Sequence, residues 1–564
     1  MASFVLERLW GDGSVETTKR VNIAIHLFNG VLVYWLFRLL LTFCPGERDS
    51  WSLPFLCTAI WLLAPLQVST VLYQVQRMAM LAATFSLLSV IAYLYWRRSI
   101  VAGNVRWVFF GLALLAGVMG LLSKENAVTV VPLLLITEIY WLQFQSKSES
   151  VGLALKRLAF GLTVGGGLLV LWLLISRWGA LEQMHELRDF TLKERILTQL
   201  IVLWDYVRQF FIPDVSRLGL YHDDVWVPSM FWRQIETVVA GIAWVSAISL
   251  CLLALRWPVA RRLAFGPLFF LVGHSLESTV WPLELYFEHR NYLPSVGLAM
   301  FFLSMLYMVQ SQWRATIRPL KCWTLIYCLW LAMLTTSQVT IWSNQNLLAL
   351  QHVVGHPESA RANRDLAHRM AELGVVDGAL DYSKRAYLAA KLHKAASDEH
   401  YGDFVLRNIA LACIAGKPLS QLEFRDLGSV HANRPLGDIA TMKVVVDLYY
   451  AERCPEFQWN LFAGHLQGLY LLEFDASLAS ARMFSALAAL ANALERWEDA
   501  YGYTARSLKL NPDDVQSMLM QLHFSSILNK GSEVSELKNR LLALKEKDKL
   551  SRSEEDTLAF YTES

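Results

Sequence analysis

Apolar runs long enough to cross a membrane are the feature that most constrains this chain. They recur between residues 22 and 342 and cover roughly 16 to 22 residues each, the length of a helix that crosses the hydrocarbon core of a bilayer. Hydrophobic residues make up 55% of the 564-residue chain, more than in an ordinary soluble protein. We therefore predict a polytopic, all-α membrane bundle with about ten spans. The expected spans are 22–43, 51–72, 78–96, 106–122, 126–142, 157–176, 235–256, 262–282, 292–310 and 322–342.

Polar, motif-like clusters lie in alternate loops between these spans, and basic residues lie in the other loops. The motif loops contain Gln74–Arg77, Ser123–Asn126, His222–Asp224 and Glu288–Asn291. The remaining loops carry Arg97, Arg98, Arg106, Lys147, Lys156, Arg157, Arg256, Arg261, Arg262, Arg314, Arg318 and Lys321. Excess Lys and Arg in short loops marks the cytoplasmic side. We therefore expect the motif loops to be periplasmic, or lumenal in a eukaryote, and favour a bacterial inner membrane.

The charge of the chain excludes one class of partner. Its formal net charge is only +2, and its basic residues are distributed among the loops that set the orientation. They form no single basic face that could follow a nucleic acid backbone. We infer that the chain contacts the lipid bilayer and has no nucleic acid partner.

A change in composition divides the chain into two predicted domains. Residues 1–344 form the membrane domain, whose longest loop, 177–234, is expected to cover the external face. Within that loop, residues 196–211 mix apolar, aromatic and charged side chains, which is typical of a helix lying in the membrane interface. From residue 345 to residue 564 the sequence is Ala-rich and amphipathic with ordinary charge. We expect this second domain to lie outside the membrane on the side of the motif loops.

The second domain contains two windows that match the tetratricopeptide pattern, which has a period of about 34 residues. The first window places small or apolar residues at Leu366, Ala367, Gly374, Ala379 and Ala386; the second does so at Phe484, Leu487, Ala488, Trp497, Ala500, Ser507 and Pro512. Small residues at these positions let paired helices pack closely. We predict a tetratricopeptide-like α-solenoid, with an irregular helical stretch at 395–480 and a concave surface that binds a protein.

The seven cysteines indicate neither a disulfide framework nor a metal site. Five of them lie in or beside apolar helices, which leaves Cys413 and Cys454 as the pair that could oxidise in the second domain. Between a disulfide and two unpaired core thiols, we favour the unpaired thiols.

Four motifs, taken in order, resemble the GT-C glycosyltransferases, and most closely the transmembrane and tetratricopeptide-repeat O-mannosyltransferases with their bacterial relatives. The motifs are Asn22–Gly30, Pro65–Thr70 followed by Gln76-Arg77, Ser123–Ala127 and Glu288–Gly297. The resemblance implies a membrane enzyme that takes a sugar from a polyprenyl-phosphate or dolichyl-phosphate carrier. It implies transfer to a hydroxyl of a secreted or surface protein on the external face.

That family has a first helix and an acidic first external loop, whose carboxylate is the presumed base. Residues 1–12 of this chain resemble the stretch that follows that loop, and no helix precedes them in the sequence. We therefore expect either that the start of this sequence is placed too late or that the protein is an inactive relative of the family. If residue 1 is the true start, the base must come from Asp223, Asp224 or Glu288.

Transfer from a lipid phosphate requires a base near the acceptor hydroxyl and cations that stabilise the departing phosphate. The candidate donor-phosphate ligands are Arg77, Lys124, His289 and Arg290, supported by Gln76, Glu125 and His222. Each has a simpler interpretation. Arg77 could be an interfacial anchor, Lys124 could pair structurally with Glu125, and Glu288–Arg290 could be a solvated loop.

Three further features have alternative interpretations. His222–Asp224 offers ligands that a divalent cation could use, but an ordinary polar turn is favoured and no metal is assigned. Asn22, His26 and Asn29 share one helix face, where hydrogen bonds to a neighbouring helix are favoured over contact with the donor. The external tryptophans are interpreted as interface residues in preference to sugar platforms: Trp172, Trp178, Trp204, Trp226 and Trp232.

Two other functions compete with protein glycosylation. A polymerase or ligase of lipid-linked glycans would use the same carrier phosphate without needing a protein-binding groove. A catalytically inactive scaffold would use the membrane domain only to anchor the repeats.

Overall fold

The computed structural model is all-helical, as predicted, and its described residues contain no β-strand. It describes the whole chain except residues 1–2, 6, 8–13, 44–50, 186–187, 189, 229, 231–233, 313–316, 393–400, 418–438, 455–458, 460–477, 548 and 564. The chain divides into two compact units, Met1–Pro357 (unit 1) and Glu358–Ser564 (unit 2).

The division between the units lies after helix α15 (Gln345–Gly355), which the sequence analysis placed in the second domain. This helix belongs to unit 1 because it packs on the 3₁₀ turn η5 (Val215–Arg217). Gln351 Nε2 donates to the carbonyl of Val215 at 2.8 Å, and a Cβ on Gly355 would overlap the carbonyl of Ser216. A glycine is therefore required where α15 meets this turn.

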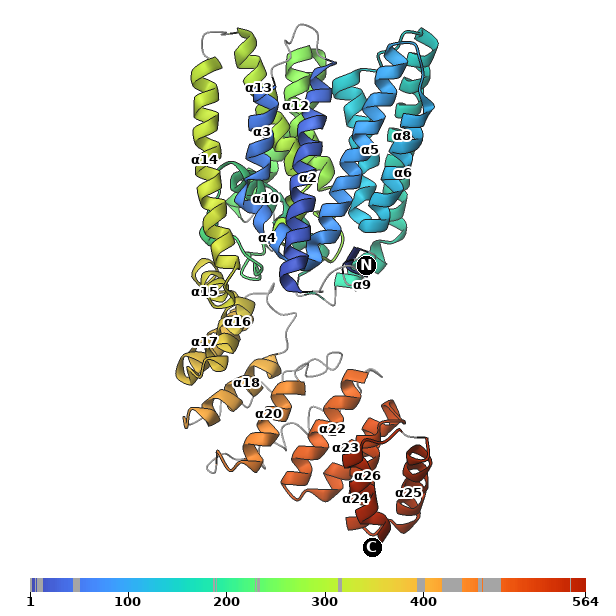
Figure 1. Cartoon of the computed structure of the whole chain (residues 1–564), viewed down its shortest axis with the longest axis vertical. Coiled ribbons are helices and arrows are strands. Elements are labelled where there is room, and N and C mark those ends of the chain that lie inside the picture. The colour runs from blue at the N-terminus through green and yellow to red at the C-terminus, as the bar shows by residue number, and fades with distance from the viewer. Residues whose placement is uncertain are drawn as a thin grey trace. The chain divides into compact units, whose positions relative to one another are not determined.

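Unit 1 is built from long helices that run roughly parallel (Figure 1). Its α-helices are α2 (Val15–Leu41), α3 (Ser52–Leu62), α4 (Val68–Leu72), α5 (Arg77–Val101), α6 (Trp107–Ser123), α7 (Val130–Ile136), α8 (Glu149–Ser176), α9 (Trp178–His185), α10 (Leu192–Phe211), α11 (Ile235–Leu253), α12 (Pro258–Gly273), α13 (Ser295–Gln312), α14 (Ile317–Trp342) and α15. Short helical turns join them: η1 (Pro65–Gln67), η2 (Gln74–Gln76), η3 (Glu125–Thr129), the π-helical η4 (Thr137–Leu142), η5, η7 (Ala254–Arg256) and η8 (Glu288–Asn291).

Helices long and apolar enough to cross a membrane number six in the described residues, or seven if the bent pair α3 and η1–α4 counts as one span. This fits an integral membrane protein. All ten ranges expected from the sequence contain helix, but α6, α12 and α13 are shorter than a typical span.

Helix α12 ends earlier than the sequence indicated. The expected span 262–282 stops being helical at Gly273, and residues 274–280 form turns. The reason is that polar side chains in this stretch find tertiary partners: the His274 ring bonds Ser278 Oγ at 3.1 Å and Asn291 Oδ1 at 3.2 Å. The prediction of a span reaching residue 282 was therefore wrong, and this segment contributes to the site described below.

The polar face of α2 binds neighbouring helices, as predicted. Asn22 Nδ2 donates to the carbonyl of Val71 at 3.0 Å, and Asn29 Nδ2 donates to the carbonyl of Met80 at 3.1 Å. The ring of His26 lies 2.8 Å from the hydroxyl of Tyr292. Buried polar groups are stable when they are paired in this way, so α2 fixes α4, α5 and the start of α13 against one another.

Unit 2 consists of paired helices. They are α16 (Ala360–Glu372), α17 (Val376–Leu392), α18 (Tyr401–Ile414), α20 (Ile439–Tyr450), α22 (Leu478–Ala493), α23 (Trp497–Leu510), α24 (Val515–Ile527), α25 (Gly531–Lys545) and α26 (Arg552–Glu563). Both predicted windows form helix pairs, α16 with α17 and α22 with α23. Gly374 joins the first pair with φ +76°, a conformation that favours glycine. Much of the irregular stretch 395–480 lies outside the described residues.

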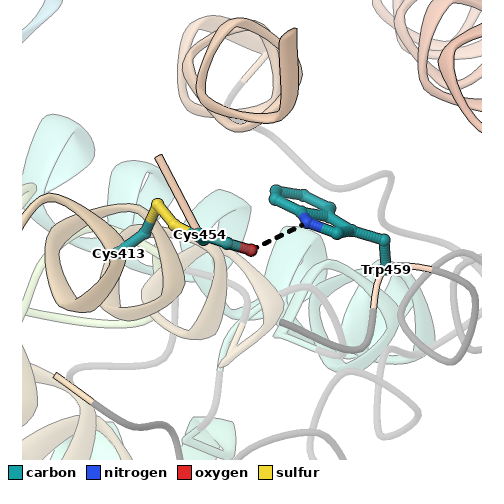
Figure 2. The surroundings of a disulfide bond; sticks show 3 residues. All are labelled: Cys413, Cys454 and Trp459. Carbon is teal, nitrogen blue, oxygen red and sulfur yellow. Dashed lines mark hydrogen bonds between the residues drawn. A yellow bond between two sulfur atoms is a disulfide. The ribbon is translucent and has the colours of Figure 1, made fainter. Parts of the chain in front are cut away.

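A disulfide joins Cys413 of α18 to Cys454, which follows α20 (Figure 2). The two Cα atoms are 5.4 Å apart, within the range that a disulfide spans. The indole N–H of Trp459 donates to the carbonyl of Cys454 at 3.2 Å. The preference for two unpaired thiols was therefore wrong, because tertiary packing brings together two cysteines that are separated by 41 positions.

We predict that alkylation in SDS without a reductant, followed by peptide mass spectrometry, leaves Cys413 and Cys454 unmodified. The free thiols Cys57, Cys322 and Cys328 serve as internal controls and should be fully alkylated. Cys454→Ser should lower the stability of the chain by about 2–4 kcal/mol, because it releases a closed loop. Alkylation of Cys413 without reduction would contradict the disulfide.

Candidate functional site

The predicted motif loops meet at one end of the unit 1 bundle. Lys124 follows α6, and it pairs with Glu277 in the loop between α12 and α13. That loop also carries η8, whose Glu288 bonds the backbone of Gly219 in the long loop 212–234. The sequence expectation that these loops share one end is therefore confirmed for residues 124, 222–224 and 288–291.

The ion pair between Lys124 and Glu277 is buried. Lys124 Nζ lies 2.5 Å from Glu277 Oε1, and Asn126 Nδ2 lies 3.5 Å from Glu277 Oε2. Burial alone would raise the pKa of Glu277, but the charges of Lys124 and Arg290 lower it below its ordinary value. The partner of Lys124 is thus a distant carboxylate instead of Glu125, which is exposed. The simpler interpretation of a pair within the tight turn was wrong.

Arg195 fixes the loop that carries Glu277. A capping box at Thr191 and Glu194 starts α10 and thereby sets the direction of Arg195, which follows directly. The guanidinium is fully buried and donates to the carbonyls of Glu277 at 2.8 Å and Thr279 at 2.9 Å, and also to that of Leu283. Burial and the nearby charge of Arg290 lower the pKa of Arg195 to about 9, so it remains charged at neutral pH.

Arg290 is a buried cation that forms no ion pair with the described residues. Only 4% of it is exposed, and no carboxylate oxygen of the described residues lies within 4.0 Å of its nitrogens. Its Nη1 lies 3.5 Å from the carbonyl of Leu285, and its guanidinium lies 5.6 Å from the ring of Phe287. An uncompensated buried charge is costly. The surroundings of Arg290 therefore favour an additional anion.

His289 is not a cation at neutral pH. Burial lowers its pKa to about 3, and the charges of Lys124 and Arg290 act in the same direction. The ring remains close to these two groups, and it can donate or accept one hydrogen bond at each nitrogen according to its tautomer. The candidate role of His289 as a charged phosphate ligand is therefore replaced by that of a neutral hydrogen-bonding group.

Glu288 is buried, and its partners differ from those of the Lys124–Glu277 pair. Its Oε1 accepts a hydrogen bond from the backbone N–H of Gly219 at 2.7 Å and lies 3.5 Å from His222 Nε2. The ring of His222 also contacts the ring of Tyr286, with centroids 4.3 Å apart. Of the three predicted acids, Glu288 is the one close to Arg290 in the sequence, two residues before it.

The other two predicted acids lie in the same loop, near α15. Asp224 Oδ1 lies 2.8 Å from His356 Nδ1, and the second nitrogen of His356 lies 3.0 Å from the carbonyl of Arg217. Asp223 is buried, with 3% exposed. The N–H of Leu220 donates to His352 Nε2 at 3.2 Å. The predicted polar turn is therefore a packed contact between loop 212–234 and α15.

Arg77 lies apart from these groups. It is fully buried, forms an ion pair with Glu7 at 2.5 Å and donates from Nε to Asn22 Oδ1 at 2.8 Å. Its guanidinium also bonds the carbonyl of Thr18 at 3.2 Å. None of its contacts involves Lys124 or Arg290, and the neighbouring Gln76 is only half-buried. Arg77 therefore forms a buried structural ion pair with Glu7. It is neither an exposed anchor nor part of the Arg290 cluster.

Sequence reasoning missed several residues that the structure adds. Glu277 was assigned to a span, where an ionisable residue is itself a signal of function. His352 and His356 lie four residues apart and so share one face of α15, a spacing that indicates a common contact. No local signal identified Arg195. Among the external tryptophans, Trp204 stacks on Trp244 with centroids 4.1 Å apart, Trp172, Trp178 and Trp226 are exposed, and Trp232 lies outside the described residues.

Comparisons with known proteins assign nothing further. No protein-family model, curated protein or solved structure matches the chain. Within the described part, no group of three or more His, Cys, Asp or Glu side chains could hold a metal ion.

We predict that Lys124→Met destabilises the chain by about 3–5 kcal/mol, because it leaves the carboxylate of Glu277 buried without its cation. The double variant Lys124→Met/Glu277→Gln should recover much of this loss. Thermal unfolding of the purified full chain in detergent measures both. Arg20→Met, which removes an exposed pair with Glu16, is the matched control and should change little. Equal, small effects of Lys124→Met and Arg20→Met would contradict a buried pair.

We predict that the contact between α15 and loop 212–234 depends on pH. Burial would lower the pKa of His356, but its hydrogen bond to Asp224 raises it above 6.5; the same bond lowers the pKa of Asp224 below 3.8, although burial opposes this. The pair thus stabilises the contact at pH values between the pKa of Asp224 and the pKa of His356. Its contribution is lost as pH rises through the raised pKa of His356.

Amide hydrogen exchange of residues 215–224 at pH 6 and pH 8, corrected for intrinsic rates, tests this. Protection should be greater at pH 6, and His356→Gln should abolish the difference. His368→Gln, at an exposed pair with Glu372 in unit 2, should leave it unchanged. A difference that persists in His356→Gln would refute the assignment.

Proposed function

We propose that this chain is a GT-C-type glycosyltransferase that moves a sugar from a polyprenyl-phosphate-linked donor to a hydroxyl of a protein. The observation that carries the proposal is Arg290, which is buried beside Arg195 and the Lys124–Glu277 pair and forms no ion pair within the part of the chain that the structure describes. Among the described residues, Arg195, Arg290 and Lys124 are permanent cations, and Glu277 is the one carboxylate that forms an ion pair with any of them. A phosphate group supplies the negative charge that this cluster lacks.

The chemistry of the cluster suits a phosphate leaving group. In the proposed reaction, the bond between the sugar C1 and the phosphate oxygen breaks, and a bond from C1 to the acceptor oxygen forms. The electron pair of the broken bond stays on the phosphate, where Arg290 and Lys124 stabilise it. Arg is suited to two parallel hydrogen bonds with a phosphate, and Lys to a compact charge. Glu288, two residues before Arg290, is our candidate to accept the hydroxyl proton.

Two features of unit 2 support a protein acceptor on the external side. The disulfide between Cys413 and Cys454 is typical of an oxidising compartment such as the periplasm. A cavity of about 470 Å³ between α20, α22, α23 and α24 offers both charges and amides, including Lys443, Asp447, Arg482 and Asn511. We propose that unit 2 is a tetratricopeptide-like solenoid that binds the acceptor, and that the bundle spans a bacterial inner membrane.

A second candidate function is an inactive membrane scaffold. The observation that favours it is that Asp224 and Glu288 both have partners within the chain, His356 and the Gly219 N–H respectively. A scaffold needs no anion at Arg290, so the two functions differ in their dependence on this residue. A polymerase or ligase of lipid-linked glycans would share that dependence but would modify no protein.

We predict that Arg290→Met lowers protein glycosylation by at least about tenfold and destabilises the chain less than Lys124→Met does. Lys124 is the ion-pair partner of Glu277 and Arg290 is not, so removing Arg290 costs less stability, whereas removing a phosphate ligand raises the reaction barrier. Mass spectrometry of envelope glycopeptides in a deletion strain complemented with each variant measures the modification, and thermal unfolding measures stability.

Arg20→Met is again the control and should restore native modification. Unchanged glycopeptides with Arg290→Met would overturn the proposed site. If the deletion strain lost lipid-linked glycan polymers but no protein modification, the polymerase would be the correct function.

A further inference from the structure

An apolar groove of about 360 Å³ lies between α5, α6, α7 and α8, and neither Arg290 nor Lys124 lines it. We call it the α8 groove. Its lining is almost entirely aliphatic and aromatic and includes Phe110, Gly117, Val131 and Leu158. Only 6% of the most apolar 18-residue stretch of α8 is buried. This helix therefore leaves the groove open toward the surroundings of the bundle. At this depth in a membrane, the surroundings are hydrocarbon chains.

One end of the α8 groove is polar and incompletely satisfied. Glu138, which lines it, forms two hydrogen bonds with Arg97 at 2.7 and 2.8 Å and accepts another from Tyr93 at 2.7 Å. Trp96 also lines the groove. Its indole N–H and the Nη1 group of Arg97 are buried and have no hydrogen-bond partner among the described residues. Burying such a donor unpaired is costly, so the Trp96 indole, which lines the groove, favours an oxygen-rich ligand at this end.

Basic side chains surround the same end. The loops 102–106 and 143–148 lie together there, because Arg97 Nη2 donates to the carbonyl of Gln145 at 2.9 Å and the Lys147 side chain lies over Gly103. Exposed cations at the ends of α5, α6 and α8 flank these loops: Arg98, Arg106, Lys147, Lys156 and Arg157. Within the range 143–157, Glu149 is the one acidic residue, and its side chain is exposed. Basic pockets between membrane helices are typical binding sites for anionic headgroups.

We propose that the α8 groove binds one anionic phospholipid of the bilayer. An acyl chain occupies the apolar part, which extends along α6 as far as Leu121, an ester oxygen accepts a hydrogen bond from the Trp96 indole, and the phosphate headgroup contacts the basic loops. The headgroup end lies at the opposite ends of α5 and α6 from Lys124, and the lipid site does not depend on the proposed transferase activity.

Native mass spectrometry of the full chain, after delipidation and addition of phosphatidylglycerol or phosphatidylcholine, tests the proposal. We expect one phosphatidylglycerol adduct that survives activation energies at which phosphatidylcholine dissociates. Gly117→Leu should remove it, because a side chain here enters the groove: the Cβ position meets only Ser89 Oγ at 3.7 Å and Val130 at 3.9 Å. Gly111→Leu is the matched control on α6, since its Cβ position meets no atom within 4 Å.

A charge variant tests the headgroup contact without altering the apolar packing. Arg98→Gln/Lys156→Gln should weaken phosphatidylglycerol binding by about fivefold per charge removed. It remains informative if Gly117→Leu disturbs folding. Equal retention of phosphatidylcholine and phosphatidylglycerol, or an adduct unchanged in the charge variant, would overturn the proposal. Displacement of phosphatidylglycerol by a polyprenyl phosphate would also overturn it, because the groove would then belong to the sugar carrier.

Discussion

The candidate site depends on the buried guanidinium of Arg195. It donates to three backbone carbonyls of the segment 277–283 and so replaces the helical hydrogen bonds that α12 gives up after Gly273. Without these bonds the segment would have unpaired carbonyls in an apolar protein, which is costly. Because Arg195 holds this segment, the Glu277 carboxylate reaches Lys124, from which it is separated by 153 positions in the sequence.

The two ends of the bundle manage buried charge differently. At the basic end, Arg97 and Glu138 compensate each other through a two-pronged ion pair. At the motif end, Arg290 forms no ion pair with a described carboxylate, and the charges of both Lys124 and Arg290 act on Glu277. A charge that is buried and uncompensated destabilises the empty protein. Such a cost is typical of a site whose missing partner is a ligand, which is why the proposed function is placed there.

The sequence predicted that each expected range contains helix, the polar face of α2 and the meeting of three of the four motif loops, because these follow from apolar periodicity and from alternation across a membrane. It did not predict the partner of Lys124, because Glu277 is distant in sequence and was counted as part of a span. The Cys413–Cys454 disulfide and the docking of His352 and His356 were missed for the same reason. Each depends on tertiary packing that no local pattern encodes. His289 was predicted as a donor-phosphate ligand from its place in a motif. That burial keeps its ring neutral is a property of the fold, which the sequence does not reveal.

Direct binding of a short-chain polyprenyl phosphate to the purified chain, followed by ³¹P NMR in detergent, tests the central claim that the Arg290 cluster is a phosphate site. We expect saturable binding of one molecule with a shifted phosphorus resonance. Arg290→Met should weaken it by at least about tenfold, the loss of one charge-assisted hydrogen-bonding partner, and Arg20→Met should bind as the native chain does. Equal affinity of the native chain and Arg290→Met would contradict the account.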